Sequence, residues 1–252
     1  MGHSPWGAQM TTQDAALRFQ LSAARQTDAA NSFARTGLIR ITEPFPADVA
    51  ERLHHHLDSG ISWGRTVSQG EKSAWDLTPE AIAALDGDKE KAFLAAVHET
   101  ARDGFQFLFD SLLVSDDPSA RNARGLLLDR VIDALNHPTS LDTFRTITGA
   151  PDIRRVNGQA TRYLPGHFLT SHDDGIDGEN RVAAYVINLT KGWRTDWGGL
   201  LQFQTGSGDV PLALKPGFNT IHLFRVPQLH SVSYVAPFAG VPRYAITGWL
   251  CR

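Results

Sequence analysis

Residues near the middle of the C-terminal half have the types and spacing of metal ligands. His172 and Asp174 stand two positions apart at the end of residues 168–172, a segment whose composition is typical of a β-strand. Side chains at positions i and i+2 of a strand project from the same face, so this imidazole and this carboxylate could share one metal ion. The triplet alone is a weak signal, because three residues match by chance in many proteins. A surface turn at residues 173–175 explains it equally well.

A second segment adds a histidine and an arginine. Residues 230–235 alternate like a strand and begin with His230, and Arg243 follows 13 positions later, after a stretch rich in proline and glycine. An antiparallel hairpin of this length would bring His230 into the interior of a β-sandwich, with Arg243 deeper. Two imidazoles and one carboxylate make the facial triad that leaves open positions on a non-heme Fe(II). His222 is an alternative distal ligand, although a hydrogen-bonded interior or surface histidine also fits its place in an expected strand.

The elements that must position these residues change in type near residue 150. Apolar residues at helical spacing predict helices at residues 12–34, 46–57, 126–135 and 141–147, and one or two longer helices within 89–113. Gly37 is expected to end the first helix, and a short strand is expected at 38–41. Short strands are expected at residues 159–163, 168–172, 182–189, 200–203, 220–224, 230–235 and 244–250. Strands at this spacing favour a sandwich or barrel over a parallel sheet.

We therefore predict an α+β fold with a jelly-roll core, a double-stranded β-helix, and an N-terminal helical layer packed on one sheet. Residues 1–252 are expected to form a single catalytic domain. Within it, residues 1–150 are predicted to be mainly helical, and residues 151–252 are predicted to form the jelly roll that carries the metal site.

Composition and charge exclude several classes of protein. The chain has 252 residues, of which 42% are hydrophobic and 20% charged, a balance typical of a globular protein. A formal net charge of −3 offers no broad attraction for nucleic acid or anionic lipid. With no apolar leader in MGHSPWGAQM, we expect a cytoplasmic protein that binds neither nucleic acid nor membrane. Cys251 is the single cysteine, so any metal must be held by nitrogen and oxygen.

Other polar residues have structural explanations. His54, His55 and His56 are consecutive on an expected helix and point in different directions, which favours a solvated face over a metal site. His167 falls in an expected turn and is predicted to lie at the surface. Asp173 is expected to face away from Asp174, because adjacent strand residues alternate, although it could orient a ligand from behind.

An ordered series of segments resembles the Fe(II)/2-oxoglutarate-dependent oxygenases, in particular the prolyl-4-hydroxylase-like group. The matching segments are residues 163–174 (YLPGHFLTSHDD), 184–189 (AYVINL), 197–200 (WGGL), 215–217 (KPG), 230–235 (HSVSYV) and 243–249 (RYAITGW). The series is far more specific than any one segment.

The resemblance implies a ligand set and a cosubstrate. It implies that His172, Asp174 and His230 bind Fe(II), and that Arg243 binds the distal carboxylate of 2-oxoglutarate. A guanidinium suits this role, because its planar fork matches a carboxylate at two points. The family pattern of a histidine followed by Val and then Arg favours His230 over His222 as the distal ligand.

Hydroxyl groups near the arginine are the next expectation. Tyr163 matches the family tyrosine that donates its hydroxyl to the cosubstrate, and Thr247, which shares the strand parity of Arg243, is a candidate second hydroxyl. Ala245 departs from the pattern, because many relatives have a serine at this position. Weaker cosubstrate binding, or compensation by Tyr163 and Thr247, is expected.

The function that the resemblance implies is hydroxylation of an unactivated C–H bond, with release of succinate and CO2. It requires Fe(II), 2-oxoglutarate and O2, with ascorbate as a candidate reductant. A prolyl residue in a protein is the leading substrate, and a translation component is a candidate partner, because the group includes hydroxylases of ribosomal and translation-factor proteins. The carboxylate of Asp174 favours hydroxylation over halogenation, because related halogenases lack it.

Three alternatives remain open at this point. The substrate could be a free amino acid or a small peptide metabolite rather than a protein. A cupin-type metal enzyme that does not use 2-oxoglutarate would explain the histidines, but it leaves Arg243 without a role. A binding module that has lost its activity would be expected to lack a ligand, and none of the three is missing.

Overall fold

The computed structural model describes residues 15–68, 74–175 and 178–252. Its helices are α2 (Ala23–Thr36), α3 (Ala47–Ser59), α4 (Pro79–Ala83), α5 (Gly87–Asp103), α6 (Pro118–Arg124), α7 (Leu127–Leu135), α8 (Pro138–Thr148) and the 3₁₀ helix η1 (Thr195–Trp197). Its strands are β1 (Leu38–Thr42), β2 (Gly64–Ser68), β3 (Ala74–Leu77), β4 (Phe107–Leu113), β5 (Arg155–Val156), β6 (Gln159–Tyr163), β7 (Phe168–His172), β8 (Arg181–Asn188), β9 (Leu201–Phe203), β10 (Leu212–Leu214), β11 (Thr220–Arg225), β12 (His230–Val232) and β13 (Arg243–Cys251). Among the described residues, no helix has the length and apolar character needed to cross a membrane.

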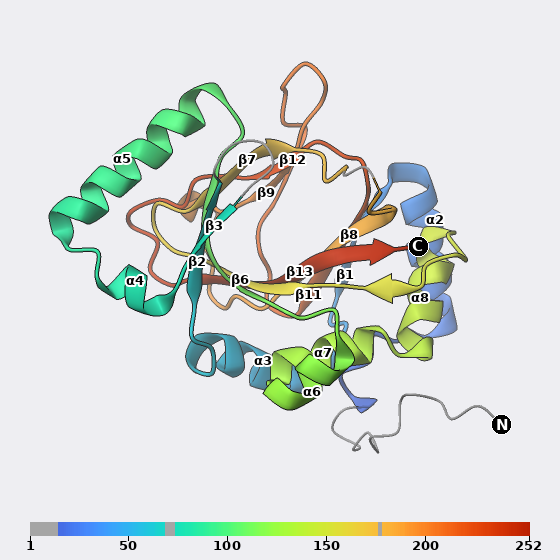
Figure 1. Cartoon of the computed structure of the whole chain (residues 1–252). Helices are drawn as coiled ribbons and strands as arrows, with labels where there is room; N and C mark the ends of the chain where they lie inside the picture. Colours follow the sequence, from blue (N-terminus) through green and yellow to red (C-terminus); the bar gives the residue numbers. More distant parts are fainter. Residues whose placement is uncertain (1–14, 69–73, 176–177) are drawn as a thin grey trace.

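The strands form a curled antiparallel sheet (Figure 1). One section has the order β1-β11-β8-β13-β6, and β4 connects it to a second section with the order β7-β12-β9-β10. The short hairpin of β2 and β3 extends from β4. This arrangement confirms the predicted α+β fold with a jelly-roll core.

The larger section of the sheet is buried on both faces. Tyr185 and Ile187 of β8 belong to the core that also includes α2, α3, α7 and α8, whereas Ala184 and Val186 face the interior of the jelly roll. Successive residues of a strand point to opposite faces, so β8 supplies both cores at once. Figure 1 shows α4 and α5 apart from the other helices, near β2 and β3. The predicted helical layer on one sheet is therefore confirmed.

The first helix is shorter than predicted. It begins at Ala23 rather than at residue 12, because the Ser22 hydroxyl accepts a hydrogen bond from the Arg25 amide and caps the helix there. Residues 12–14 lie outside the described residues. In the segment before the cap, alternate residues are buried, which are Leu17, Phe19 and Leu21. The helix ends as predicted at Gly37, which has a left-handed φ of 67°.

The predicted helix at residues 89–113 is wrong in its second half. Helix α5 ends at Asp103, and residues 107–113 form β4, which pairs with β2, β6 and β7. The alternating phenylalanines at 105, 107 and 109 follow the period of a strand rather than that of a helix. The half of the chain predicted as mainly helical thus contributes four strands, β1 to β4. The other predicted helices and strands agree with the structure to within three residues at their ends.

A buried ion network ties β2, β4 and β6 together. The Asp110 carboxylate is fully buried and accepts hydrogen bonds from Arg65 at 2.9 Å and from Arg162 at 2.7 Å. His167 lies close enough to be influenced by these charges, and burial lowers its pKa to about 4. His167 is 3% exposed, so its predicted surface position is wrong. Its imidazole stays neutral because the interior disfavours the charged form.

This burial predicts a loss of stability in acid. The folded pKa of His167 is about 4 and the unfolded value is 6.5, so the unfolded chain binds the extra proton as pH falls below about 6.5. We expect the free energy of unfolding to fall by on the order of 1 to 2 kcal/mol from this residue between pH 7 and pH 5. Urea unfolding at both pH values should show a smaller loss for His167→Gln than for the wild type. His98→Gln, at an exposed position, is the control. Equal losses in all three proteins would contradict the assignment.

Candidate functional site

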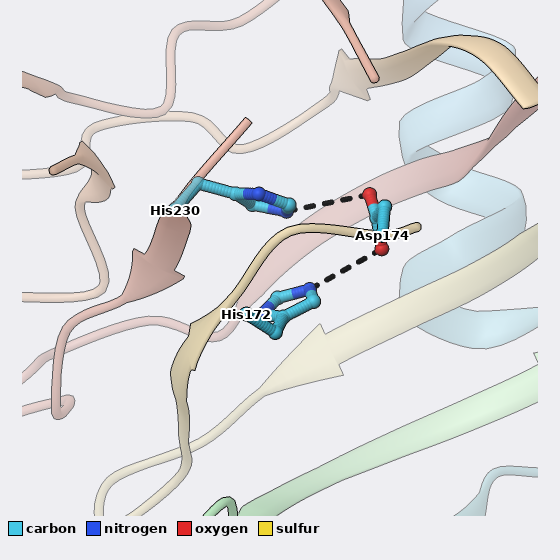
Figure 2. A group of neighbouring side chains, drawn as sticks. All are labelled: His172, Asp174 and His230. Atoms are coloured by element: carbon cyan, nitrogen blue, oxygen red, sulfur yellow. Dashed lines mark ion pairs between the residues drawn. The ribbon is translucent and has the colours of Figure 1, made fainter. Parts of the chain in front are cut away.

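Strand pairing places the two predicted histidine ligands side by side. His172 ends β7, His230 begins β12, and these two residues are directly paired in the antiparallel register. Their ring centroids lie 4.1 Å apart. Asp174 follows β7 with a left-handed φ of 63°, and Figure 2 shows its carboxylate facing both imidazoles. Its oxygens lie 3.3 Å from His172 Nε2 and 3.4 Å from His230 Nε2.

Main-chain carbonyls determine which nitrogen of each imidazole carries the proton. His172 Nδ1 lies 3.0 Å from the Thr170 carbonyl, and His230 Nδ1 lies 2.7 Å from the Gln228 carbonyl. Because a carbonyl oxygen can only accept, each Nδ1 is the donor. Each Nε2 of the neutral rings therefore presents a lone pair, which is the form that binds a metal.

With both rings in this neutral tautomer, three electron-pair donors converge. The candidate ligand atoms of His172, Asp174 and His230 all lie within 4.8 Å of one another. Burial, together with the nearby His172, lowers the pKa of His230 and keeps it neutral. Lone pairs and a carboxylate facing one another are repulsive unless a cation lies between them. This donor set fits a divalent metal such as Fe(II) with an open coordination face.

The three candidate ligands line a cavity of about 670 Å³ that extends into the jelly roll. The cavity wall includes all six residues predicted from the sequence, which are His172, Asp174, His230, Arg243, Tyr163 and Thr247. A space of this size is ample for a small molecule next to a metal. The fold therefore brings the six residues to one cavity.

Arg243 provides a buried positive charge in this cavity. It is 2% exposed and begins β13 directly opposite Tyr163 of β6, with its guanidinium carbon 4.9 Å from the centre of the Tyr163 ring. Arg243 Nε has no hydrogen-bond partner, and no carboxylate of the described residues forms an ion pair with the side chain. Burial lowers the pKa of Arg243 and raises that of Tyr163 to about 12. A buried cation without a counter-ion is costly, so this end of the cavity fits an anionic ligand.

The remaining predicted contact residues follow the alternation of β13. Arg243, Ala245 and Thr247 are two apart and share the interior face, where Ala245 packs with Val186. Thr247 is paired with Gln159 on one side and with Val186 on the other. The departure at Ala245 is thus inside the jelly roll, next to Arg243, where a hydroxyl is missing.

Two other polar residues lie outside the ligand set. Asp173 accepts a hydrogen bond from the Gly175 amide at 2.9 Å, so its carboxylate holds the turn after β7. His222 is fully buried and lies 3.4 Å from the Asn188 amide nitrogen. The cluster of candidate ligand atoms contains His230 and not His222, which favours His230 as the distal ligand.

Two features of the cavity were not predicted from the sequence. The phenylalanines at 105, 107 and 109 line one wall, with consecutive ring centroids 5.6 Å and 5.3 Å apart, and the last lies 5.3 Å from Tyr163. The two-residue alternation of these phenylalanines indicates a strand, but the helical spacing of apolar residues across the whole segment predicts a helix. Arg181 lies 3.7 Å from the centre of the Trp249 ring and donates to the Asp174 carbonyl at 3.2 Å. No spacing in the sequence singles out this arginine.

Comparison with known proteins agrees with this geometry. Residues 158–251 match the family model described as the 2OG-Fe(II) oxygenase superfamily. No curated protein matches the chain. A Pseudomonas putida prolyl-4-hydroxylase is 17% identical, with a TM-score of 0.55 over 90% of this chain and 98% of its own. A Trichoplax adhaerens prolyl hydroxylase, solved with a peptide of the hypoxia inducible factor oxygen degradation domain, is 16% identical, with a TM-score of 0.57 over 90% and 89%.

The same fold also serves another reaction. The non-heme alpha ketoglutarate dependent epimerase SnoN from nogalamycin biosynthesis is 11% identical, with a TM-score of 0.54 over 90% of this chain and 84% of its own. Identities this low establish the shared fold alone, whereas the family match covers all six cavity residues predicted from the sequence. Residues 158–251 thus match the 2OG-Fe(II) oxygenase superfamily, and the chain has a prolyl hydroxylase-like fold.

Proposed function

We propose that the protein hydroxylates a prolyl residue of a protein or peptide, with conversion of 2-oxoglutarate to succinate and CO2. In this proposal His172, Asp174 and His230 hold Fe(II), and Arg243 binds the distal carboxylate of the cosubstrate. One observation carries the proposal. A single cavity has three convergent electron-pair donors on its wall and also a buried, uncompensated guanidinium.

The residues of the cavity have separate tasks in this reaction. Fe(II), 2-oxoglutarate and O2 together supply the oxidant that replaces hydrogen by hydroxyl at an unactivated carbon. Arg243 neutralises the distal carboxylate in a dry environment, where such a pair is strong. The Tyr163 and Thr247 hydroxyls line the same cavity and are proposed to donate to the cosubstrate. The Tyr163 hydroxyl stays protonated, because burial raises its pKa to about 12.

The cavity wall favours an uncharged ring as the substrate group. The aromatic residues at 105, 107 and 109 provide an apolar surface that leads from His172 to Tyr163, and the ring of Phe105 lies 5.6 Å from that of His172. A pyrrolidine ring can pack against such faces, whereas a charged side chain would lose its hydration there. This wall supports a prolyl group over a charged amino acid side chain.

A polar group next to the metal site suits a peptide backbone. The Arg181 side chain is 10% exposed, and its Nε has no hydrogen-bond partner, although it lies 4.0 Å from the Glu179 carboxylate. A peptide carbonyl could accept from this guanidinium while the prolyl ring occupies the cavity. The peptide bound by the Trichoplax adhaerens relative supports a peptide substrate here. A loop of a translation component is our first candidate.

Anaerobic spectroscopy tests the cosubstrate assignment. Fe(II) and 2-oxoglutarate added to the wild-type protein should produce a weak visible charge-transfer band, because the keto acid chelates the metal. The band should be absent in Asp174→Gly, which removes a ligand at a position where glycine adopts the observed φ of 63° without strain. Asp173→Ala should keep the band, because the Asp173 carboxylate accepts from the Gly175 amide and lies outside the candidate ligand cluster. A wild-type protein without the band would refute the use of 2-oxoglutarate.

Arg243 can be tested by separating cosubstrate binding from metal binding. Lysine at this position keeps a basic group but loses the bidentate fork, so we expect Arg243→Lys to require about tenfold or more 2-oxoglutarate for half-maximal band intensity. Its affinity for Fe(II), measured by equilibrium dialysis, should remain that of the wild type. If Arg243→Lys loses affinity for Fe(II) and for 2-oxoglutarate to the same extent, Arg243 has a structural role instead.

The substrate is tested by mass spectrometry of cells that contain or lack the protein. We expect prolyl peptides that gain one oxygen atom only when the wild-type protein is present, and no such gain with Asp174→Gly. Ribosomal and translation-factor peptides are the first to inspect. An oxygen gain confined to free amino acids or small peptides would contradict a protein substrate, while leaving the oxygenase activity intact.

A further inference from the structure

Three unpartnered polar atoms lie inside the jelly roll near Arg243. They are Arg243 Nε, His222 Nε2 and Asn188 Oδ1, and none has a hydrogen-bond partner. His222 and Asn188 are fully buried. Burying a polar group without a partner is costly, so a group of such atoms in one interior indicates that a ligand or water completes it.

Strand register places these residues on one face of the sheet. Asn188 of β8 is paired with Ala245 of β13, and His222 of β11 is paired with Val186, which is in turn paired with Thr247. Phe224, two positions after His222 and therefore on its face, lies 4.7 Å from the His230 ring, between ring centroids. The imidazole of His222 thus lies on the same sheet face as Val186 and Thr247, which line the cavity.

Hydrogen bonding around Asn188 leaves Nε2 as the unpartnered nitrogen of the His222 ring. The Asn188 amide nitrogen lies 3.2 Å from the Val186 carbonyl and 3.3 Å from the Thr220 hydroxyl, which itself donates to the Gly217 carbonyl. The same nitrogen faces His222 Nδ1 at 3.4 Å, so its two hydrogens are shared among three acceptors. In the tautomer that takes part in this contact, Nδ1 accepts and Nε2 carries the proton.

The imidazole remains neutral in this environment. Burial lowers the pKa of His222 to about 3, and the nearby guanidinium groups of Arg40 and Arg243 act in the same direction. A neutral imidazole can lie close to Arg243 without charge repulsion. His222 thus offers one N–H, buried and unpartnered, in the interior that holds the unpaired guanidinium.

We propose that His222 Nε2 donates a hydrogen bond to the distal carboxylate of 2-oxoglutarate, which Arg243 neutralises. The imidazole would replace the hydroxyl that Ala245 lacks. This inference rests on the proposed function, because it requires the dicarboxylate to occupy the cavity. It assigns a third buried donor of the jelly-roll interior, beyond Arg243 and Tyr163, to the cosubstrate.

Equilibrium binding to the protein loaded with Mn(II) tests this role without turnover. Calorimetric titration should show that His222→Leu weakens 2-oxoglutarate binding by about tenfold, the size expected for one hydrogen bond to a charged group. Binding of oxalate should be unchanged, because oxalate chelates the metal but does not extend to Arg243. His222→Gln, which keeps an N–H near the position of Nε2, should recover part of the loss. His98→Leu, the same substitution at an exposed position of α5, is the control and should bind both ligands like the wild type.

The outcomes separate the two proposals. If the wild type binds 2-oxoglutarate and His222→Leu binds it equally well, the role of His222 is refuted and the proposed function stands. If His222→Leu weakens the binding of oxalate and of 2-oxoglutarate equally, the role of His222 is structural. A wild type that binds oxalate but not 2-oxoglutarate would refute the proposed function itself.

A measurement on the wild type avoids dependence on the folding of the variants. With Zn(II) in place of Fe(II) and ¹⁵N-labelled histidine, the Nε2 proton of His222 should move downfield on addition of 2-oxoglutarate and not on addition of oxalate. An unchanged resonance at saturating 2-oxoglutarate would overturn the proposal.

Discussion

The antiparallel pairing of β7 with β12 is the constraint on which the site depends. It places His172 opposite His230, and the turn after β7 then returns the Asp174 carboxylate to both rings. A shift of one residue in this register would turn one imidazole to the other face and separate the ligands. The neighbouring β9 also pairs with β12 and includes Phe203 opposite His230, so the register is fixed from both sides.

The two groups of polar residues in the cavity have opposite electrostatic character. Three electron-pair donors gather where β7 and β12 meet, whereas Arg243 and Tyr163 are supplied by β13 and β6. The aromatic wall of β4 connects these two groups and limits the water between them. A molecule that chelates a cation with one end and carries a carboxylate at the other matches both groups at once. Low polarity between them strengthens each interaction.

Much of this arrangement could be predicted from the sequence, because it depends on local period and on an ordered series of motifs. The strands that carry His172, His230 and Arg243 follow a two-residue alternation, and the roles expected of these residues came from the resemblance of the segments around them to an oxygenase family. The strand β4 was missed because its alternating phenylalanines continue from a strongly helical segment, and only pairing with β2, β6 and β7 distinguishes the two. His167 was misplaced because its burial depends on the distant Asp110, which no local pattern reveals. The stacking of Arg181 on Trp249 joins strands far apart in sequence and has no local signal either.

The two ends of the cavity differ in how they tolerate sequence change. Both ligand imidazoles are oriented by the carbonyl of the residue two positions earlier, and a carbonyl is present whatever side chain that residue carries. The side chain of Gln228 can therefore change without loss of this contact, whereas the Thr170 hydroxyl also bonds to the main chain of Gln106. The anion end relies on side chains alone, so each substitution there alters affinity directly. Substitution can in this way alter the affinity for an anionic ligand while the candidate metal site keeps its geometry.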